Sequence, residues 1–256
     1  MKLEFKHNKF LGQNFLKSKK IIDEIIKTAD IEGEDVVLEA GPGKGILTEE
    51  LIKKAKKVIV VEKDRRLVEC LQERFKNARN LEIIHGDILK FQTPIPPGRD
   101  KYQNYKIVAN IPYYITSRFF RKFLQSDFQP SKMVLMVQKE VAERIVSKKE
   151  SILSISIKSY GLPKIIKKVP ASYFLPKPKV DSAILLIDKI SKEFFKNINE
   201  ASFFNLLKKG FSSRRKMLKN NLKLLNTERL IICGIAKKAR PEDLSPEKWK
   251  CLFLIK

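Results

Sequence analysis

The fold of this chain is most constrained by an alternation of short apolar runs with amphipathic segments, from Asp35 to Val146. The apolar runs have the length of β-strands, and the segments between them have helical spacing. This order predicts an α/β fold in which helices cover both faces of a parallel sheet. The expected strands lie within residues 35–55, 57–64, 81–89, 105–114 and 132–138, the expected helices within 21–29, 35–55, 65–76, 117–124 and 139–146, and a proline- and glycine-bearing loop at 93–104.

The remainder of the chain has a different pattern. Residues 151–161 alternate isoleucine with serine, which predicts a strand, and residues 169–188 predict a proline-stiffened loop followed by a late strand. From about Ser191 the sequence is helical, polar and very basic. A chain of 256 residues can form one large domain or two unequal ones, and this change predicts a boundary near residue 190.

The net charge indicates the class of partner. The chain has 53 Lys and Arg against 29 Asp and Glu, which gives +24 and a pI of about 9.9. Such an excess favours a polyanion, most commonly nucleic acid, with a membrane surface as the alternative. The longest apolar run, residues 230–236, is too short to span a bilayer, and residues 1–10 lack the apolar core of a secretory signal. We therefore expect a cytoplasmic protein without a membrane segment.

Cysteine and histidine offer little chemistry in this chain. Cys70, Cys233 and Cys251 are odd in number and far apart, which fits neither a disulfide framework nor a zinc site. We expect three thiols in a reducing compartment and no metal site. With only His7 and His85 available, acid–base catalysis by histidine is not expected either.

A glycine turn, EAGPGKG at residues 39–45, follows the first expected strand. Glycine lets the backbone turn sharply and approach a ligand, with the N-terminus of the next helix behind it. The third glycine of the dinucleotide fingerprint is replaced by Ile46. The turn therefore favours a nucleoside cofactor without a pyrophosphate over NAD, and a purely structural turn is the alternative.

Two acids follow the next strands. Glu62 ends the second strand, where a carboxylate can accept hydrogen bonds from ribose hydroxyls. Asp87 ends the third strand and can accept from an adenine amine, although an aspartate after a glycine is more often a turn residue or a helix cap. Because parallel strands bring their carboxyl ends to one edge, a ligand site is the favoured interpretation.

The fourth strand runs into NIPYYITS, residues 110–117. The side-chain oxygen of Asn110 and the carbonyl of Ile111 can both accept from an exocyclic amine, and the Ile111 carbonyl points outward because Pro112 fixes the next turn. Tyr113 can stack on the ring of the same base. A strand exit with a proline turn is the alternative, and the position beside a nucleoside site favours binding of an extruded base.

A basic stretch covers residues 206–223, LLKKGFSSRRKMLKNNLK. It carries seven Lys or Arg and no acid. A run of charge is usually a solvated face. In a chain of this net charge, however, so one-sided a run favours contact with a phosphate backbone.

Together these motifs resemble those of the ribosomal RNA adenine dimethyltransferases, which dimethylate two neighbouring adenines near the 3′ end of small-subunit (16S) rRNA. The resemblance covers nearly the whole chain. It implies a Rossmann-like class I methyltransferase domain over residues 1–190, with a basic N-terminal arm, and a helical RNA-binding domain over 191–256. It also implies a helix, and not a strand, at 151–161. The motifs that carry it are LGQNFL (11–16), EAGPGKGILTEEL (39–51), VVEKD (60–64), HGDIL (85–89), VANIPYYITS (108–117), VQKEVAERI (137–145), FLPKPKVDSA (174–183) and FSSRRKMLKNNL (211–222).

The resemblance also implies the cofactor, the partner and the site residues. The cofactor is S-adenosylmethionine, and the partner is small-subunit rRNA within a pre-30S particle, bound by a monomer that acts in ribosome biogenesis. The implied cofactor contacts are Asn14, Leu16, Gly41, Glu62, Asp87 and Asn110. The implied contacts to the target adenine are Asn110, Ile111, Pro112 and Tyr113, with Phe174 as a second aromatic wall. The expected RNA-binding residues are Arg214, Arg215, Lys216 and Lys219.

Other functions share parts of this pattern. Large-subunit rRNA adenine methyltransferases have the same glycine turn and NIPY, and only the basic stretch favours the small subunit. A non-catalytic assembly or transcription factor is disfavoured by the intact Asn110 and Tyr113. A DNA adenine methyltransferase would have proline in place of Ile111, and Ile46 argues against a dehydrogenase.

Overall fold

The computed structural model describes residues 13–92, 105–213, 215–222 and 227–255. The loop expected at 93–104 and the first two residues of LGQNFL lie outside the described residues. The chain forms two compact units. The first unit comprises Met1–Ala142 and Lys164–Ile190, and the second comprises Glu143–Pro163 and Ser191–Lys256.

The first unit is built on a seven-stranded sheet of order β4-β3-β2-β5-β6-β9-β7. The pairs from β4 to β6 are parallel, whereas β9 runs antiparallel to β6. Every residue of β2 is buried, as expected for a parallel strand with both faces covered. The strands are β2 (Val36–Ala40), β3 (Lys57–Glu62), β4 (Leu81–His85), β5 (Tyr105–Asn110), β6 (Lys132–Gln138), β7 (Leu162–Val169) and β9 (Ser182–Asp188).

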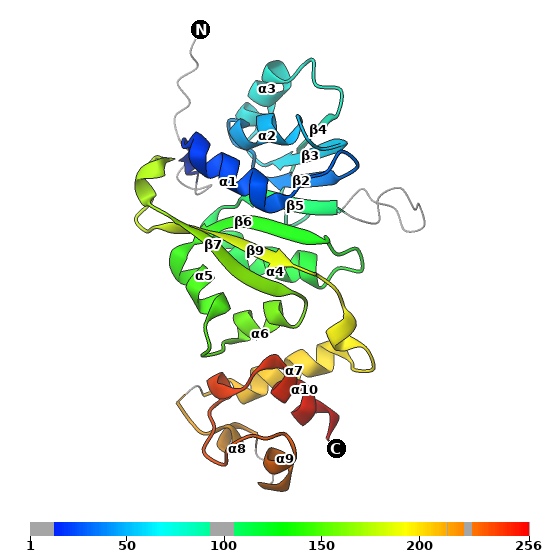
Figure 1. The fold of residues 1–256 in the computed structure, drawn as a ribbon, viewed down its shortest axis with the longest axis vertical. Helices are drawn as coiled ribbons and strands as arrows, with labels where there is room; N and C mark the ends of the chain where they lie inside the picture. The colour runs from blue at the N-terminus through cyan, green and yellow to red at the C-terminus, as the bar shows by residue number, and fades with distance from the viewer. Residues whose placement is uncertain (1–12, 93–104, 214, 223–226, 256) are drawn as a thin grey trace. The chain divides into compact units, whose positions relative to one another are not determined.

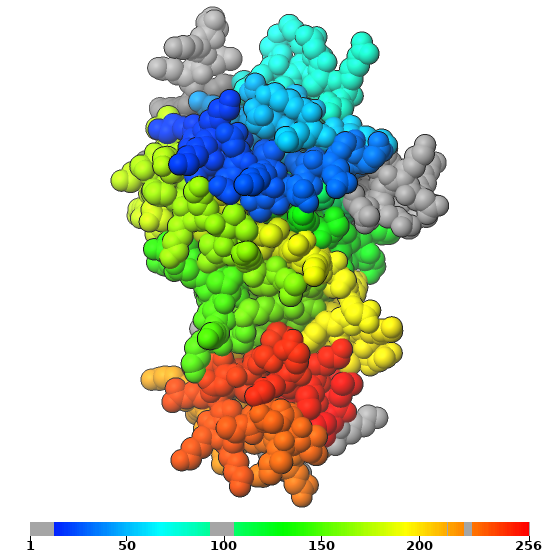
Figure 2. Space-filling view, in the orientation of Figure 1, coloured from blue at the N-terminus to red at the C-terminus, as the bar shows by residue number. Residues whose placement is uncertain are grey.

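Helices cover both faces of this sheet, which confirms the predicted α/β fold. Figure 1 shows α1 (Lys19–Ala29) in front of the sheet and α4 (Thr116–Leu124) behind it. The isoleucines of α1 recur at helical spacing and are buried against the strands, and three phenylalanines of α4 are buried in the same way. In the space-filling view α1, in dark blue, forms part of the outer surface (Figure 2). The other helices of the first unit are α2 (Ile46–Leu51) and α3 (Arg65–Arg74), and α5 (Lys139–Val146) begins in the first unit and ends in the second.

A separate two-stranded sheet joins distant parts of the first unit. β1 (Phe15–Leu16) pairs antiparallel with β8 (Phe174–Leu175), with Leu16 opposite Phe174. This pairing brings the motif around Asn14 next to the loop that precedes β9.

In the described part of the second unit after Ser191, all the regular elements are helices, joined by turns. An aromatic core, which includes Phe203 and Trp249, is almost inaccessible to solvent. Gly210 lets α7 pass close to this core, since a Cβ atom there would lie 2.2 Å from the Trp249 ring. The elements are η5 (Glu193–Phe195), α7 (Glu200–Gly210), α8 (Leu218–Asn221), α9 (Thr227–Ile232), η6 (Pro241–Asp243) and α10 (Pro246–Leu254).

Residues 143–163 belong to this second unit, although the sequence placed them before the boundary near 190. The amide of Glu150 donates to the carbonyl of Glu242 at 2.8 Å, and Lys149 forms an ion pair with Asp243. These contacts attach the segment to η6. The assignment of catalysis to residues 1–190 and of RNA binding to 191–256 stays a prediction.

The strand predicted from the isoleucine–serine alternation is wrong. Helix α6 spans Ile152–Lys158, in agreement with the family resemblance. The reason is a reciprocal capping box. The hydroxyl of Ser151 accepts from the amide of Ser154 at 3.1 Å, and the hydroxyl of Ser154 accepts from the amide of Ser151 at 2.7 Å. Two of the serines therefore act in starting a helix and not as the polar face of a strand.

The expectation of three thiols is also wrong. Cys233 and Cys251 form a disulfide with their Cα atoms 5.7 Å apart, and Cys70 is free. The two partners are 18 residues apart in sequence. They meet because Cys233 follows α9 and Cys251 lies in α10, an encounter that sequence spacing did not indicate.

Candidate active site

A pocket opens at the carboxyl edge of the sheet, where β2, β3, β4 and β5 end. Its walls are the glycine turn, the acid that ends β3, the acid that follows β4, the segment after β5 and the chain around β1. Parallel strands present their carboxyl ends at one edge, so motifs that are far apart in sequence meet here. The predicted residues that line the pocket are Asn14, Leu16, Gly41, Glu62, Asp87, Asn110, Ile111, Pro112 and Tyr113.

The glycine turn has a backbone conformation that other residues rarely adopt. Gly41 and Gly43 have φ angles of +68° and +60°. A Cβ atom at Gly43 would also lie 2.8 Å from the ring of Phe15, so a larger residue would displace the β1 segment. The amide of Gly41 donates to the carbonyl of Val61 at 2.9 Å. The turn therefore keeps bare backbone at the pocket wall, where a ligand can approach closely.

Glu62 is fixed against this turn. Its two carboxylate oxygens accept from the amide of Gly43 at 3.2 Å and from the amide of Asp64 at 2.9 Å. Burial raises the pKa of Glu62, and the backbone hydrogen bonds oppose that effect only in part. Each carboxylate oxygen has a second lone pair, so an oriented acceptor remains for a pair of hydroxyls such as those of ribose.

Asp87 follows β4, the strand that pairs with β3. Its carboxylate forms an ion pair with Lys63 at 2.9 Å and accepts from the amide of Leu89 at 3.0 Å. Burial alone would raise the pKa of Asp87, but the ion pair and the amide outweigh it, so the pKa is lowered. Asp87 is therefore an ionised acceptor at neutral pH, as recognition of an adenine amine requires.

Asn110 is oriented by the β1 segment. Its Nδ2 donates to the carbonyl oxygen of Asn14 at 3.0 Å. Because a carbonyl can only accept, this contact fixes which end of the amide is the nitrogen. The side-chain oxygen of Asn110 then remains as an acceptor in the pocket that Gly41 and Pro112 also line.

Tyr113 is anchored through its hydroxyl, which the sequence did not indicate. The hydroxyl lies 2.6 Å from the Oγ of Ser182, a fully buried residue at the start of β9. Burial raises the pKa of Tyr113. A ring that is hydrogen-bonded at its far end has little freedom to swing, so one flat wall of the pocket is fixed before any base enters.

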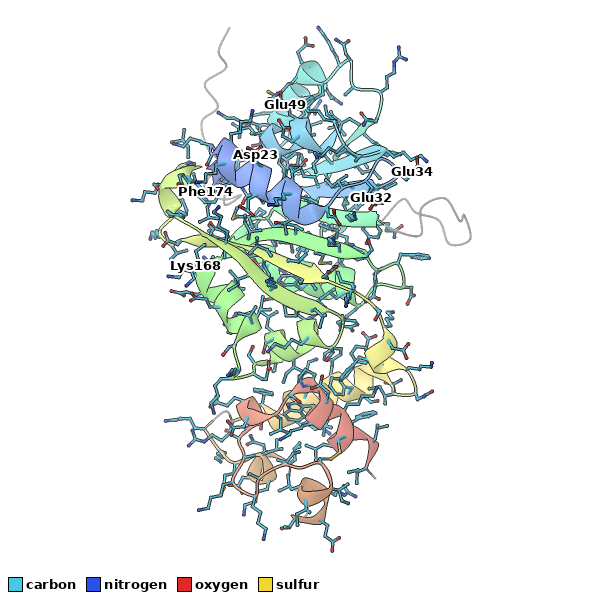
Figure 3. The ribbon with its side chains drawn as sticks, viewed as in Figure 1. Asp23, Glu32, Glu34, Glu49, Lys168 and Phe174 are labelled. Atoms are coloured by element: carbon cyan, nitrogen blue, oxygen red, sulfur yellow. A yellow bond between two sulfur atoms is a disulfide. The ribbon has the colours of Figure 1, made fainter. Side chains whose placement is uncertain are left out.

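Phe174 is the predicted site residue that does not line the pocket. It is only 1% exposed and packs in the same hydrophobic cluster as Leu16 and Ile22. Figure 3 labels Phe174 in the segment that lies beside α1. In this structure Phe174 supports the β1 segment, and its role as a second wall for a base stays a prediction.

Glu39 lines the pocket and was missed by the sequence reasoning. It is 1% exposed in β2, and its carboxylate accepts from the hydroxyl of Thr48 at 2.7 Å. Burial raises the pKa of Glu39 to about 8, with the Thr48 hydrogen bond lowering it and the charge of Glu62 raising it further. The sequence contained a signal, because Glu39 lies inside the apolar run VVLEA. Burying a carboxylate costs free energy unless it is hydrogen-bonded or protonated, so an acid at such a position suggests a specific role.

Comparison with known proteins gives the family of this chain. A family model described as ribosomal RNA adenine dimethylase matches residues 4–256. The chain belongs to that family. This adenine dimethylase is 44% identical, over 97% of its length and 88% of the relative, to ribosomal RNA small subunit methyltransferase A of Dehalococcoides mccartyi. It is 39% identical to the Clostridium botulinum protein of the same name, over 97% of this chain and 93% of that one.

Solved structures agree with the sequence matches. A dimethyladenosine transferase from Plasmodium falciparum has a TM-score of 0.79 and 29% identity, covering 94% of this chain and 96% of that one. The 23S rRNA methyltransferase ErmE has a TM-score of 0.77 and 28% identity, covering 94% and 98%. The predicted class I methyltransferase fold is therefore confirmed, and the chain is an rRNA adenine dimethyltransferase.

The pocket of this dimethylase suits the cofactor that methyltransferases typically use. Three features fit the adenosine part of S-adenosylmethionine. Gly41 offers bare backbone, the carboxylate oxygens of Glu62 can accept hydrogen bonds from ribose hydroxyls, and the ionised Asp87 can accept one from the adenine amine. Within the described ranges, no group of three or more His, Cys, Asp or Glu could hold a metal ion. Nor does the described part of the chain contain a helix long and apolar enough to cross a membrane.

The basic residues predicted to bind RNA lie in the second unit of the dimethylase. Arg215, Lys216 and Lys219 are exposed between α7 and the end of α8, whereas Arg214 lies outside the described residues. Asn221 holds this turn, since its Nδ2 donates to the carbonyls of Gly210 at 2.6 Å and Ser213 at 2.9 Å. The segment combines a fixed backbone with exposed cations.

Proposed function

We propose that this enzyme uses S-adenosylmethionine to dimethylate the N6 amines of two adjacent adenines near the 3′ end of small-subunit (16S) rRNA. The proposed substrate is the rRNA within a pre-30S particle, and the enzyme acts as a cytoplasmic monomer in the biogenesis of the small subunit. The observation that carries the proposal is the anchored Asn110 amide, which lines the same pocket as the glycine turn and the ring of Tyr113 that Ser182 holds. The small-subunit names of the relatives at 44% and 39% identity support the choice of rRNA.

When bound, S-adenosylmethionine supplies a methyl group that is electrophilic because it is attached to a sulfonium. The protein must then align the amine. The side-chain oxygen of Asn110 and the carbonyl of Ile111 accept the two amine hydrogens, which turns the nitrogen lone pair toward the cofactor. Tyr113 stacks on the adenine and limits its rotation.

Alignment alone can account for a large rate increase. Holding two reactants in a productive geometry lowers a barrier by up to about 7 to 11 kcal/mol in well-oriented model reactions. The described pocket contains no histidine. None is needed, since the methylated amine loses its proton readily to water. Each adenine needs two transfers, with exchange of the cofactor between them.

A labelling experiment tests the proposed substrate. The protein is incubated with methyl-labelled S-adenosylmethionine and either unmethylated small subunits or unmethylated large subunits, and the modified base is mapped. We expect two dimethylated adenines in the small-subunit rRNA only. Label at a single large-subunit adenine would support instead the activity named for ErmE, whose structure has a TM-score of 0.77 against this chain.

Calorimetry tests the cofactor separately. We expect binding of S-adenosylhomocysteine and weak or no binding of NAD, because the glycine turn lacks the third glycine at Ile46 that close pyrophosphate binding requires. Binding of NAD without binding of S-adenosylhomocysteine would contradict the proposal.

A further inference from the structure

Helix α4 begins three residues after Tyr113, so it starts at the pocket. Its two sides are unlike. Phe119, Phe120 and Phe123 are fully buried behind the sheet. Arg118 and Arg121 are exposed, and Lys122 is partly exposed. The spacing of these cations places them on one side of the helix. A rigidly packed helix therefore presents a basic stripe that begins at the pocket.

Tyr114 stands where this stripe meets the pocket. It lines the pocket, yet it is 53% exposed, unlike the half-buried Tyr113 next to it. An aromatic side chain with half of its surface in water, at the mouth of a base-binding pocket, can stack on a second base without entering the site.

The charges around Tyr114 favour an anion. Asp87 is the main cause of the raised pKa of Lys63, and Lys63 also interacts electrostatically with Tyr114 and with Arg118. Asp87 is the nearby acid, and it forms an ion pair with Lys63. Among the described residues, Arg118 and Arg121 have no carboxylate within ion-pair distance. Such cations, beside an exposed ring, fit the alternation of base and phosphate in a nucleic-acid strand.

We propose that Tyr114 and the basic stripe of Arg118, Arg121 and Lys122 bind the single-stranded nucleotides next to the target adenine. The ring of Tyr114 stacks on the neighbouring base, and the cations contact the phosphates beside it. These residues belong to the first unit, whereas Arg215, Lys216 and Lys219 belong to the second. The identity of the bound strand rests on the proposed function. This surface also gives a reason for adjacent targets, since the adenine that is not in the pocket is already held at its mouth.

The test for the stripe uses the full-length protein and a short single-stranded RNA with two adjacent adenines. Arg118→Ala/Arg121→Ala should bind this RNA about tenfold more weakly. The slope of log K against log salt should become shallower by about 1.4, because each of the two lost phosphate contacts contributes about 0.7. The matched control is Lys27→Ala/Lys54→Ala, which removes two exposed lysines, one in the last turn of α1 and one shortly before β3, neither of which lines the pocket. An unchanged affinity and slope in the arginine variant, or an equal change in the control, would overturn the proposal.

The test for Tyr114 is spectroscopic. With 2-aminopurine next to the target adenine, stacking on Tyr114 quenches its fluorescence. Tyr114→Ala should lose that quenching and bind the RNA about 10- to 100-fold more weakly, and Tyr114→Phe should restore both. Equal quenching in wild type and Tyr114→Ala would show that the ring does not stack.

Failure of this inference can be told from failure of the proposed function. If wild type binds S-adenosylhomocysteine and methylates the small subunit while these variants bind RNA normally, only the role of the stripe is wrong. If wild type neither binds S-adenosylhomocysteine nor transfers methyl groups to rRNA, the proposed function itself fails. Calorimetry with S-adenosylhomocysteine should give the same affinity for wild type and both double variants, and thermal unfolding should give the same midpoint for wild type and Tyr114→Ala, which shows that the fold is intact.

Discussion

The pocket of the first unit and the basic segment of the second unit are built in opposite ways. In the pocket, Glu62, Asn110 and Tyr113 each have a specific hydrogen-bond partner and restricted motion. In the basic segment, Arg215 and Lys216 are exposed to solvent. The pocket therefore depends on geometry, and the segment depends on charge. Substitutions should affect the two regions through different measurable quantities.

The largest effect is expected on the pH dependence of stability, through Glu39. The pKa of Glu39 in the folded protein, about 8, lies above the ordinary value of 4.5 for a glutamate, so the folded protein binds more protons than the unfolded one between these values. Stability must then fall as pH rises from about 4.5 to about 8. Glu39→Gln keeps an acceptor for Thr48 and does not titrate. It should be more stable than wild type by several kcal/mol at pH 8 and by little at pH 5.

Urea unfolding between pH 5 and pH 9 measures this difference. Glu69→Gln, which removes an exposed acid from α3, is the control and should follow the wild-type curve. Curves for Glu39→Gln and wild type that stay parallel across the range would show that Glu39 is not a buried, protonated acid.

The next effect concerns the anchored amide. Asn110→Ala removes the acceptor that aligns the amine, and we expect single-turnover methyl transfer to slow about 100- to 1000-fold, as when one preorganised hydrogen-bond group is lost elsewhere. Asn110→Asp should not restore the rate, because a carboxylate cannot donate to the Asn14 carbonyl. Wild-type transfer by the aspartate variant would mean that this hydrogen bond does not orient the site.

A smaller effect is expected from the stacking ring. Tyr113→Ala should slow transfer about 10- to 100-fold, in line with base–aromatic stacking. Tyr113→Phe keeps the ring and should recover most of the rate. It leaves the buried Ser182 hydroxyl without its partner, so its thermal stability should drop slightly. Equal transfer rates for wild type and Tyr113→Ala would identify Tyr113 as a packed turn residue.

The smallest effect on transfer itself is expected from the basic segment. Arg214→Ala/Arg215→Ala/Lys216→Ala should weaken RNA binding and reduce its salt slope by about 2, at about 0.7 per phosphate contact. The affinity for S-adenosylhomocysteine should not change. Filter binding over a range of salt concentrations checks this, and an unchanged slope would show that the segment is only a solvated face.

The sequence predicted the sheet well for a physical reason. Strands such as β2 are buried on both faces and therefore appear as continuous apolar runs. Once those strands are parallel, their carboxyl ends must share an edge, so the positions of Gly41, Glu62, Asp87 and Asn110 followed from the order of the motifs.

What the sequence missed depends on contacts between distant residues. The hydroxyl of Tyr113 forms a hydrogen bond with Ser182, which lies 69 residues away in the sequence. Cys233 forms a disulfide with Cys251, 18 residues further along the chain. The isoleucine–serine alternation of α6 is compatible with both a strand and a buried helix. The capping box of Ser151 and Ser154 favours the helix. Phe174 became buried because β8 pairs with β1, which no local pattern indicates.

One measurement tests the contrast between the two regions most directly. Single-turnover transfer to unmethylated small subunits is followed as the subunit concentration is raised, for wild type, Asn110→Ala and Arg215→Ala/Lys216→Ala. We predict that Asn110→Ala lowers the rate at saturation without changing the half-saturating concentration. The double variant should raise the half-saturating concentration and reach the wild-type rate at saturation. A lowered rate at saturation in the double variant, or a wild-type rate at saturation in Asn110→Ala, would contradict this account. The pocket would then not act through positioning alone, or the basic segment would not act through electrostatic binding alone.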